Sequence, residues 1–171
     1  MSYNWNWGVF LQPSASGDDT YLGWLFTGLK WTISLSLSAW VIALIVGSII
    51  GVLRTVPNRW LSGFATGYVE LFRNIPLLVQ LFIWYFVLPE LLPPDLGNAF
   101  KQSNPLWQQF FSAMLCLGLF TSARVAEQVR SGINALPKGQ RAAGLAMGFT
   151  LPQVYRHVLM PMAYRIIMPP L

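Results

Sequence analysis

The sequence contains very few charged residues. Asp, Glu, Lys and Arg make up only 10% of the chain, whereas about a quarter of the residues of an average soluble domain are charged. Apolar residues account for 54%, and the mean hydropathy is +0.49. A soluble domain of this size would need more polar residues to cover its core. The composition therefore predicts an integral membrane protein that is in contact with lipid.

Cysteine and histidine are also scarce. The only cysteine, Cys116, lies inside an apolar run, so neither a disulfide framework nor a zinc site can form within one chain. We expect it to be a small residue that faces lipid or another helix. The only histidine, His157, has no cysteine or acidic cluster beside it, so we expect it on a helix surface and not as a metal ligand.

Two further absences limit the function. The sequence has no Gly-x-x-x-x-Gly-Lys-Ser/Thr run to hold nucleotide phosphates, and no catalytic triad or metal constellation points to an active site. The net charge is +5, but the basic residues flank apolar runs and do not gather in one cluster, which argues against nucleic-acid binding. We expect no catalysis, no cofactor and no nucleic-acid partner for this chain.

Long uncharged runs predict membrane-spanning helices. Lys30 and Arg54 bracket twenty-three uncharged residues, enough for a helix that needs ~20 residues to cross a bilayer. The segment before this run lacks a basic start followed by an apolar core, so residues 1–28 are interpreted as an extracytoplasmic segment and not as a cleavable signal peptide. The whole pattern predicts an all-α transmembrane domain over 29–171, with spans at 29–53, 61–88 and 106–127.

Two pairs of glycines have the spacing of close helix contacts. Gly47 and Gly51 lie in the first span, and Gly63 and Gly67 repeat the same spacing in the second. Small residues four apart permit two helices to approach closely. Glycine is also ordinary in membrane helices, so the sequence leaves both interpretations open.

Charged residues interrupt the second and third spans. Glu70 and Arg73 stand three apart, on one helical face, where they could neutralise each other. Charges at membrane depth usually face a bundle interior or a wet cavity, so the pair is a candidate for function, with a structural ion pair as the alternative. At the end of the third span, Glu127 could neutralise Arg124 or Arg130 in the same way.

The distribution of Lys and Arg predicts the orientation of the chain. The connection between the second and third spans offers only Lys101. Because positive residues favour the cytoplasmic side, the N-terminus is expected outside the cell and the segment 136–161 in the cytoplasm. The residues that gather on this expected inner side are Arg54, Arg59, Arg130, Lys138, Arg141 and Arg156.

The segment 136–161 is a basic, glycine-punctuated insert between apolar runs. Pro137 suits the first turn of a short helix, and Gly148 suits its end. Thr150 and Gln153 then have the spacing of a capping box, so a second helix is expected to start at once. A helix of about ten residues is ~15 Å long and cannot cross a ~30 Å bilayer. We therefore expect a tight corner outside the membrane that contacts another protein.

The corner also carries a spaced motif. Ala142, Ala143 and Gly144 are followed after three residues by Gly148, and after nine more by Val158 and then Met160-Pro161. The spacing resembles a loop of bacterial ATP-binding cassette (ABC) importer permeases, which reads Glu-Ala-Ala, three residues, Gly, nine residues, Ile, one residue, Leu-Pro. Ala142 replaces the glutamate and Gly144 the second alanine. Further matches fall at 68–73, 76–81 and 129–133.

From about residue 27 onward, the chain resembles the polar amino acid permeases of this class, and most of all the glutamate/aspartate importer permeases. The resemblance implies a type I ABC importer permease domain in the bacterial inner membrane, with a coupling loop at about 131–160. It implies a second permease subunit, a dimer of cytoplasmic subunits that bind the ATP, and a periplasmic binding protein for amino acids. The coupling residues that it implies are Gly139, Gln140, Arg141, Ala142, Ala143, Gly144, Gly148 and Pro161.

The last apolar run begins at Met160 and reaches residue 171 before it is long enough to span a membrane. Because the resemblance implies further spans, we expect a permease domain that is truncated after the coupling loop. An acidic amino acid needs cationic partners in a path of low dielectric constant, and Arg73 and Arg124 are the available candidates. Together with Glu70, which stands three residues before Arg73, they are the expected substrate-path residues. The alternative function is a noncatalytic membrane adaptor or assembly factor that recruits a cytoplasmic partner through the same corner.

Overall fold

The computed structural model describes residues 6–15, 17, 19–137 and 139–168. Within these ranges the chain is helical and contains no strand, only an isolated bridge between Pro13 and Thr20. The all-α prediction is confirmed. The chain divides into two compact units, 1–37 and 38–171.

In the first unit, a short 3-10 helix, η1 (Trp7–Leu11), precedes the start of the long helix α1 (Tyr21–Leu53). Thr20 caps α1, because its Oγ1 accepts a hydrogen bond of 3.2 Å from the backbone N–H of Gly23. The helix therefore begins eight residues before the span that the sequence predicts from residue 29. The sequence places the start of the span near Lys30 because this charge marks one end of the uncharged run, but the helix also includes residues 21–28.

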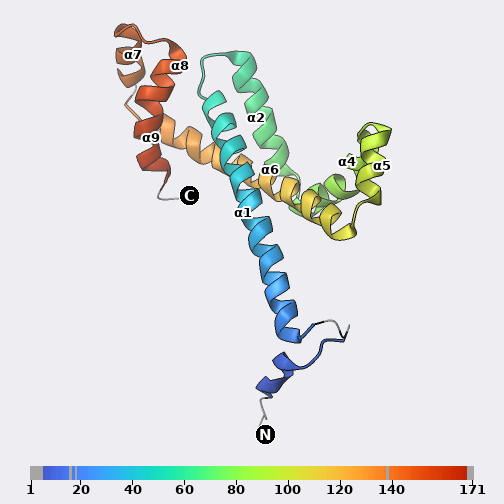
Figure 1. Ribbon diagram of the computed structural model, residues 1–171. Helices are drawn as coiled ribbons and strands as arrows, with labels where there is room; N and C mark the ends of the chain where they lie inside the picture. Colours follow the sequence, from blue (N-terminus) through green and yellow to red (C-terminus); the bar gives the residue numbers. More distant parts are fainter. Residues whose placement is uncertain (1–5, 16, 18, 138, 169–171) are drawn as a thin grey trace. The chain divides into compact units, whose positions relative to one another are not determined.

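The second unit contains the C-terminal part of α1 and all the later helices (Figure 1). Two of its segments, η2 and η3, are π-helices within longer helical stretches. The elements are α2 (Arg59–Asn74), α3 (Leu77–Phe82), η2 (Ile83–Val87), α4 (Leu88–Leu91), α5 (Pro94–Gln102), α6 (Pro105–Asn134), α7 (Gly139–Ala146), α8 (Leu151–Val154), η3 (Tyr155–Leu159) and α9 (Met160–Ile167).

Helices α1 and α6 are each long and apolar enough to cross a membrane. The predicted second span is instead two helical segments, α2 and the stretch Leu77–Leu91, which bend by 103°. The described part of the chain thus has two candidate spans, or three if the bent pair counts as one. The bounds of the predicted second span, 61–88, are close to those of the bent pair, which begins at Arg59 and ends at Leu91. The polar connection before the third span also contains a helix, α5, which the sequence did not predict.

The bend lies at Ile75 and Pro76, and the side chain of Gln80 stabilises it. Its Nε2 donates to the carbonyl oxygens of Phe72 at 3.0 Å and of Ile75 at 2.9 Å. These carbonyls lie at the end of α2, where the helix leaves acceptors without intrahelical partners. Gln80 is only 3% exposed, so it satisfies them in a place that water does not reach freely.

Helices α1 and α6 pack tightly in the second unit through the first pair of glycines. A Cβ atom on Gly47 would lie 2.6 Å from the carbonyl oxygen of Ser122, and one on Gly51 would lie 2.7 Å from Cβ of Val129. Both distances are too short for any side chain, so the close-approach interpretation of this pair is confirmed. Gly63 and Gly67 have open space around them and make no such contact within the described part of the chain.

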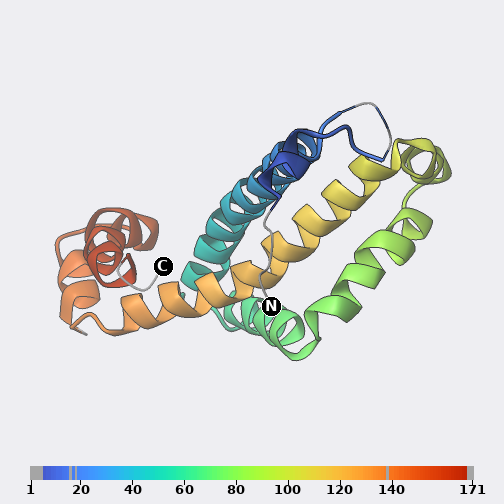
Figure 2. The same ribbon diagram turned by 90° about the horizontal axis from the view of Figure 1, so that it is seen from below.

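The contacts between α1 and α6 also fix their relative direction. Gly47 contacts Ser122, and Gly51, one turn further on, contacts Ala126 and Val129. The part of α1 that belongs to the second unit therefore runs in the same general direction as α6 and contacts it (Figure 2, teal against orange). Arg54 at the end of α1 and Arg130 near the end of α6 consequently lie on one side, as the Lys and Arg distribution predicts.

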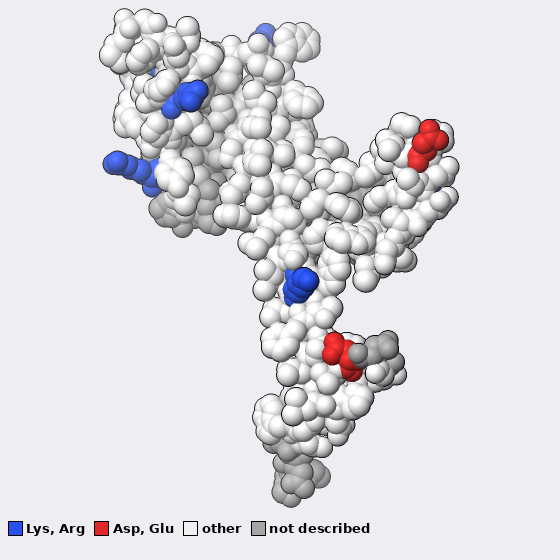
Figure 3. All heavy atoms as spheres, in the orientation of Figure 1, with Lys and Arg blue, Asp and Glu red and all other residues white. Residues whose placement is uncertain are grey.

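Much of the surface is apolar. Large side chains such as Ile45, Ile49 and Phe64 are exposed on α1 and α2. On the face drawn in Figure 3, charged atoms form only a few separate groups among uncharged ones. Such a surface suits lipid or other membrane helices. It is consistent with a multi-pass membrane protein.

Candidate functional site

The corner between α7 and α8 has the glycine stop and the capping box that the sequence predicts, but α7 (Gly139–Ala146) begins after Pro137, which is therefore not in its first turn. Gly148 ends α7 with φ of +87°, a left-handed conformation that favours glycine. The capping box is present at the start of α8, where the backbone N–H of Thr150 donates to Oε1 of Gln153 at 2.8 Å. Figure 1 shows α7 folded back beside α8.

A glycine also permits the two helices of the corner to touch. Gly144 is buried on α7, and a Cβ atom added there would lie 3.0 Å from Cγ2 of Val154, which is itself fully buried. The glycine that departs from the family pattern therefore lies where α7 packs against α8. The structure gives a packing reason for this departure that the sequence did not show.

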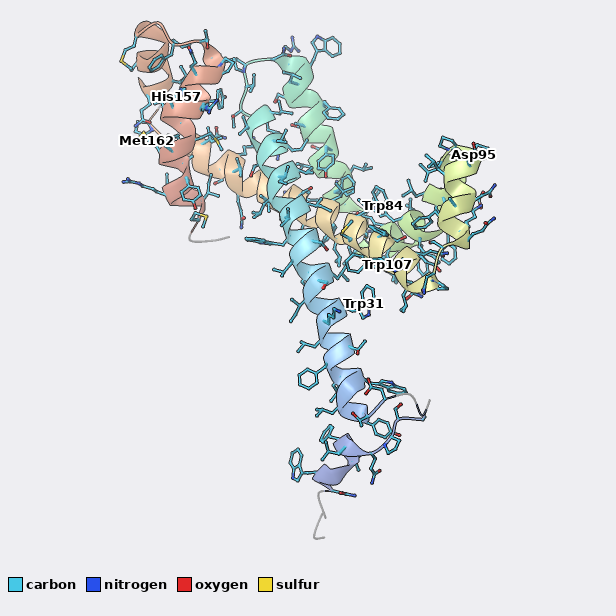
Figure 4. All side chains as sticks on the ribbon, viewed as in Figure 1. Trp31, Trp84, Asp95, Trp107, His157 and Met162 are labelled. Atoms are coloured by element: carbon cyan, nitrogen blue, oxygen red, sulfur yellow. The ribbon has the colours of Figure 1, made fainter. Side chains whose placement is uncertain are left out.

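The rest of α7 and its exit present apolar side chains to the outside. Ala142 and Ala143 are exposed, as are Leu145, Met147 and Phe149. His157 lies on the surface next to Phe149, with 6.4 Å between the ring centroids, so its predicted surface position is confirmed (Figure 4). This exposed set, Ala142, Ala143, Leu145, Met147 and Phe149, is called the corner face below.

One hydrogen bond joins the corner to the turn after α1. Tyr155 is 7% exposed, and its hydroxyl oxygen lies 3.0 Å from Oγ1 of Thr55. The two residues help to line a pocket of about 360 Å³ with Arg141 and Leu159. A displacement of the corner would therefore also move, or break its hydrogen bond to, the turn after α1.

A second group of polar residues surrounds Glu127 on α6. Its Oε1 lies 2.7 Å from Nη1 of Arg54 and 3.2 Å from Nη1 of Arg73, and its Oε2 lies 3.6 Å from Nη1 of Arg130. The side chain of Arg54 is only 7% exposed, whereas Arg73 and Arg130 are about half exposed. One carboxylate thus forms ion pairs with three guanidinium groups from three different segments.

The expected pairing of Glu70 with Arg73 is wrong. Arg73 points to Glu127, 54 residues later in the chain, and donates a hydrogen bond to it. Glu70 makes no ion pair among the described residues and lines a different groove with Arg59 and Thr66. The spacing along α2 would permit the local pair, but the packing of α2 against α6 brings the carboxylate of Glu127 to Arg73.

Arg73 and Arg124 do come together. With Glu127 and Phe120 they line an open pocket of about 440 Å³ on α2 and α6, called the arginine pocket below. The guanidinium carbon of Arg124 lies 4.9 Å above the ring centre of Phe120, a cation–π contact.

The expected pairing of Glu127 with Arg130 is confirmed. Its other expected partner, Arg124, makes no ion pair within the described ranges. The sequence did not single out Arg54 for this site, since it is far from Glu127 along the chain. Phe120 lies on the same helix as Glu127, but an aromatic residue in an apolar run gives no signal of such a role.

Comparisons with known proteins agree with this architecture. Residues 43–171 match the family described as binding-protein-dependent transport system inner membrane component. Over its whole length the chain is 62% identical to the glutamate/aspartate import permease protein GltJ of Escherichia coli (strain K12), and it covers 70% of that protein. It is 36% identical over 94% of its length to the arginine transport system permease protein ArgU of Corynebacterium glutamicum, and covers 52% of it.

A second permease and a solved structure extend the similarity. The chain is 33% identical over 86% of its length to the glutamate/aspartate import permease protein GltK of Escherichia coli O6:H1, and covers 64% of it. A crystal structure of an amino acid ABC transporter with histidines superposes with a TM-score of 0.66, at 30% identity, over 88% of this chain and 64% of the solved one. The chain therefore belongs to the family of binding-protein-dependent transport system inner membrane components, as a noncatalytic permease subunit of an amino acid ABC importer.

Proposed function

We propose that the chain forms the membrane path for the ATP-driven import of glutamate and aspartate. The observation that carries this proposal is the 62% identity with GltJ along the full chain. The similarity to GltK supports a second, different permease subunit as its partner. ATP would be bound by a pair of cytoplasmic subunits, and the amino acid would be delivered by a periplasmic binding protein.

The arginine pocket supports an anionic substrate. Arg73 and Arg124 face one open space, and guanidinium groups bind carboxylates through paired, charge-assisted hydrogen bonds. Both side chains belong to apolar helices, where an uncompensated charge is costly and usually serves a function. We assign Arg73 and Arg124 to the substrate path. Glu70 lies outside this pocket and has no role in the proposal.

The corner supports coupling to an ATPase. A short helix with an exposed apolar face is suited to a groove on a partner protein, and the corner face has this character. The hydrogen bond from Tyr155 to Thr55 provides a route from that face to α1. Closure of the ATPase dimer would then move the corner and the helices as rigid bodies and change the side from which the substrate path is open.

The orientation follows from the positive residues. Arg54, Arg59 and the basic residues of the corner are placed in the cytoplasm, where the ATPase must act. The N-terminal segment 1–28 is then outside the inner membrane. The common direction of α1 and α6 supports this arrangement, because it brings the ends of both helices to one side.

Reconstitution of the complete importer in liposomes tests the proposal. The chain is combined with its second permease, the ATPase and the binding protein, and the uptake of glutamate, aspartate, glutamine and arginine is measured with and without ATP. We expect ATP-dependent uptake of the two acidic amino acids, together with ATP hydrolysis that they stimulate. Preferred uptake of arginine or glutamine would refute the substrate assignment. Binding of an ATPase without stimulated hydrolysis would favour the adaptor alternative.

A further inference from the structure

The arginine pocket contains more positive charge than its own carboxylate can neutralise. Arg73 and Arg124 line the pocket together with the single carboxylate of Glu127. This carboxylate also forms ion pairs with Arg54 and Arg130, which do not line the pocket, so it cannot neutralise both pocket arginines. In surroundings of low dielectric constant, such an excess attracts anions strongly.

The three partners of Glu127 are not equivalent. Arg54 is buried and makes the shortest contact, at 2.7 Å. Arg73 makes a longer contact to the same oxygen atom, is half exposed, and lines the pocket. Glu127 would therefore keep its buried partner if Arg73 turned away from it. An unpaired buried charge is the costly outcome when an ion pair of this kind is broken. If Arg73 exchanges Glu127 for another carboxylate, no buried charge is left unpaired.

We infer that Glu127 acts as a built-in competitor for the substrate carboxylate: it holds Arg73 while the path is empty, and an acidic amino acid takes Arg73 over. This inference rests on the proposed function of the arginine pocket. Arg124, held over Phe120 and without an ion-pair partner in the described part of the chain, supplies the second cation. An acidic amino acid has two carboxylates for these two arginines, whereas a neutral amino acid has one.

Such competition limits how tightly the path binds its substrate. The substrate carboxylate that binds Arg73 must first displace the carboxylate of Glu127 from it. Because Arg73 is partly exposed, its pair with Glu127 is worth what exposed ion pairs are usually worth, up to about a fivefold factor in binding. Glu127 is accordingly a specificity-determining and positioning residue: it keeps Arg73 oriented and prevents the substrate from remaining bound.

The test is equilibrium binding of radiolabelled glutamate to the purified complex of permeases and ATPase in lipid nanodiscs, without the binding protein. Glu127→Gln should tighten binding by about two- to fivefold. Arg73→Gln should weaken it at least about tenfold, and the double variant should bind as weakly as Arg73→Gln. Arg130→Gln is the matched control, because Arg130 also contacts Glu127 but does not line the pocket. It should change binding by less than about twofold.

Two results would overturn the inference: unchanged or weaker binding by an assembled Glu127→Gln complex, or a loss with Arg130→Gln as large as that with Arg73→Gln. If Glu127→Gln prevents assembly by leaving Arg54 buried and unpaired, Arg54→Met/Glu127→Gln removes both charges together and should show the same tightening. Uptake by the wild-type importer separates the two proposals. If the wild type imports glutamate but Glu127→Gln has no effect on binding, only the competition by Glu127 is refuted. If the wild type does not import glutamate, the proposed function is refuted.

Discussion

Tyr155 and Thr55 are one hundred residues apart in the sequence, yet their hydroxyl groups lie 3.0 Å apart. Tyr155 starts the π-helical segment that follows α8, and Thr55 lies in the turn between α1 and α2. This contact joins the corner to the first long helix. It is therefore one contact through which a movement of the corner would reach the membrane part of the second unit.

We expect Tyr155→Phe to reduce the coupling of transport to ATP hydrolysis. The change removes the hydroxyl group and keeps the ring in the core, so it should cost only about 0.5–1.5 kcal/mol of stability. Stimulated ATPase activity and uptake are measured on the reconstituted importer. Tyr164→Phe is the control, since Tyr164 is 60% exposed on α9. Equal behaviour of the two variants would show that the hydroxyl contact has no role in coupling.

Gly148→Ala should distort the corner without affecting the membrane helices. The position has open space around it, but its φ of +87° is costly for any residue with a Cβ atom, by about 1–2 kcal/mol. Binding of the ATPase and transport should both fall, while the yield in the membrane stays normal. Gly63→Ala serves as the control, because it also has open space and lacks the left-handed conformation. Normal ATPase binding by Gly148→Ala would contradict the role of this glycine.

Replacement of Gln80 should loosen the bend between α2 and α3. Gln80→Met keeps the size of the side chain but leaves the carbonyls of Phe72 and Ile75 without its two hydrogen bonds. A buried unsatisfied acceptor costs about 1–3 kcal/mol, so the melting temperature of the detergent-purified complex should fall. Gln102→Met, at an exposed position on α5, should leave it unchanged. A melting temperature of Gln80→Met equal to that of wild type would show that the bend does not depend on this side chain.

Cysteine labelling in whole cells tests the orientation. Asn98 on α5 and Gly139 on α7 are both exposed, whereas the native Cys116 is fully buried and gives little background. A reagent that cannot cross the membrane should label Asn98→Cys in intact cells. It should label Gly139→Cys only after the inner membrane is permeabilised. The reverse pattern would place the corner outside and exclude its contact with a cytoplasmic ATPase.

Features set by local residues were predictable from the sequence. The stop at Gly148 and the capping box of Thr150 and Gln153 depend on neighbours within four residues, and both are confirmed. The long apolar helices follow from composition in the same way. The close contact of Gly47 with α6 was one of two open interpretations, because spacing alone does not show which face of a helix has a neighbour.

The arrangement of the charges was not predictable, since it depends on which helices pack together. Arg73 has a carboxylate three residues before it, but α2 packs on α6 and brings Glu127 to its guanidinium group. The role of Gln80 escaped prediction for a related reason. A glutamine in an apolar run has no obvious partner until the chain bends and leaves carbonyl groups free. Arg73 and Arg124 were identified as candidates by charge alone, and their shared pocket became visible only in the structure.

The parallel contact between α1 and α6 has a consequence for biosynthesis. Gly47 and its neighbour Ser122 are about 75 residues apart, so α1 leaves the ribosome well before the helix that it packs against. At a synthesis rate of about 5–20 residues per second, the delay is roughly 4–15 s. Throughout this interval the face of α1 that carries Gly47 and Gly51 lacks the helix that covers it in the folded protein. A nascent chain paused within α6 would therefore expose this close-packing face of α1 to the insertion machinery and to other newly made proteins, with which it could associate.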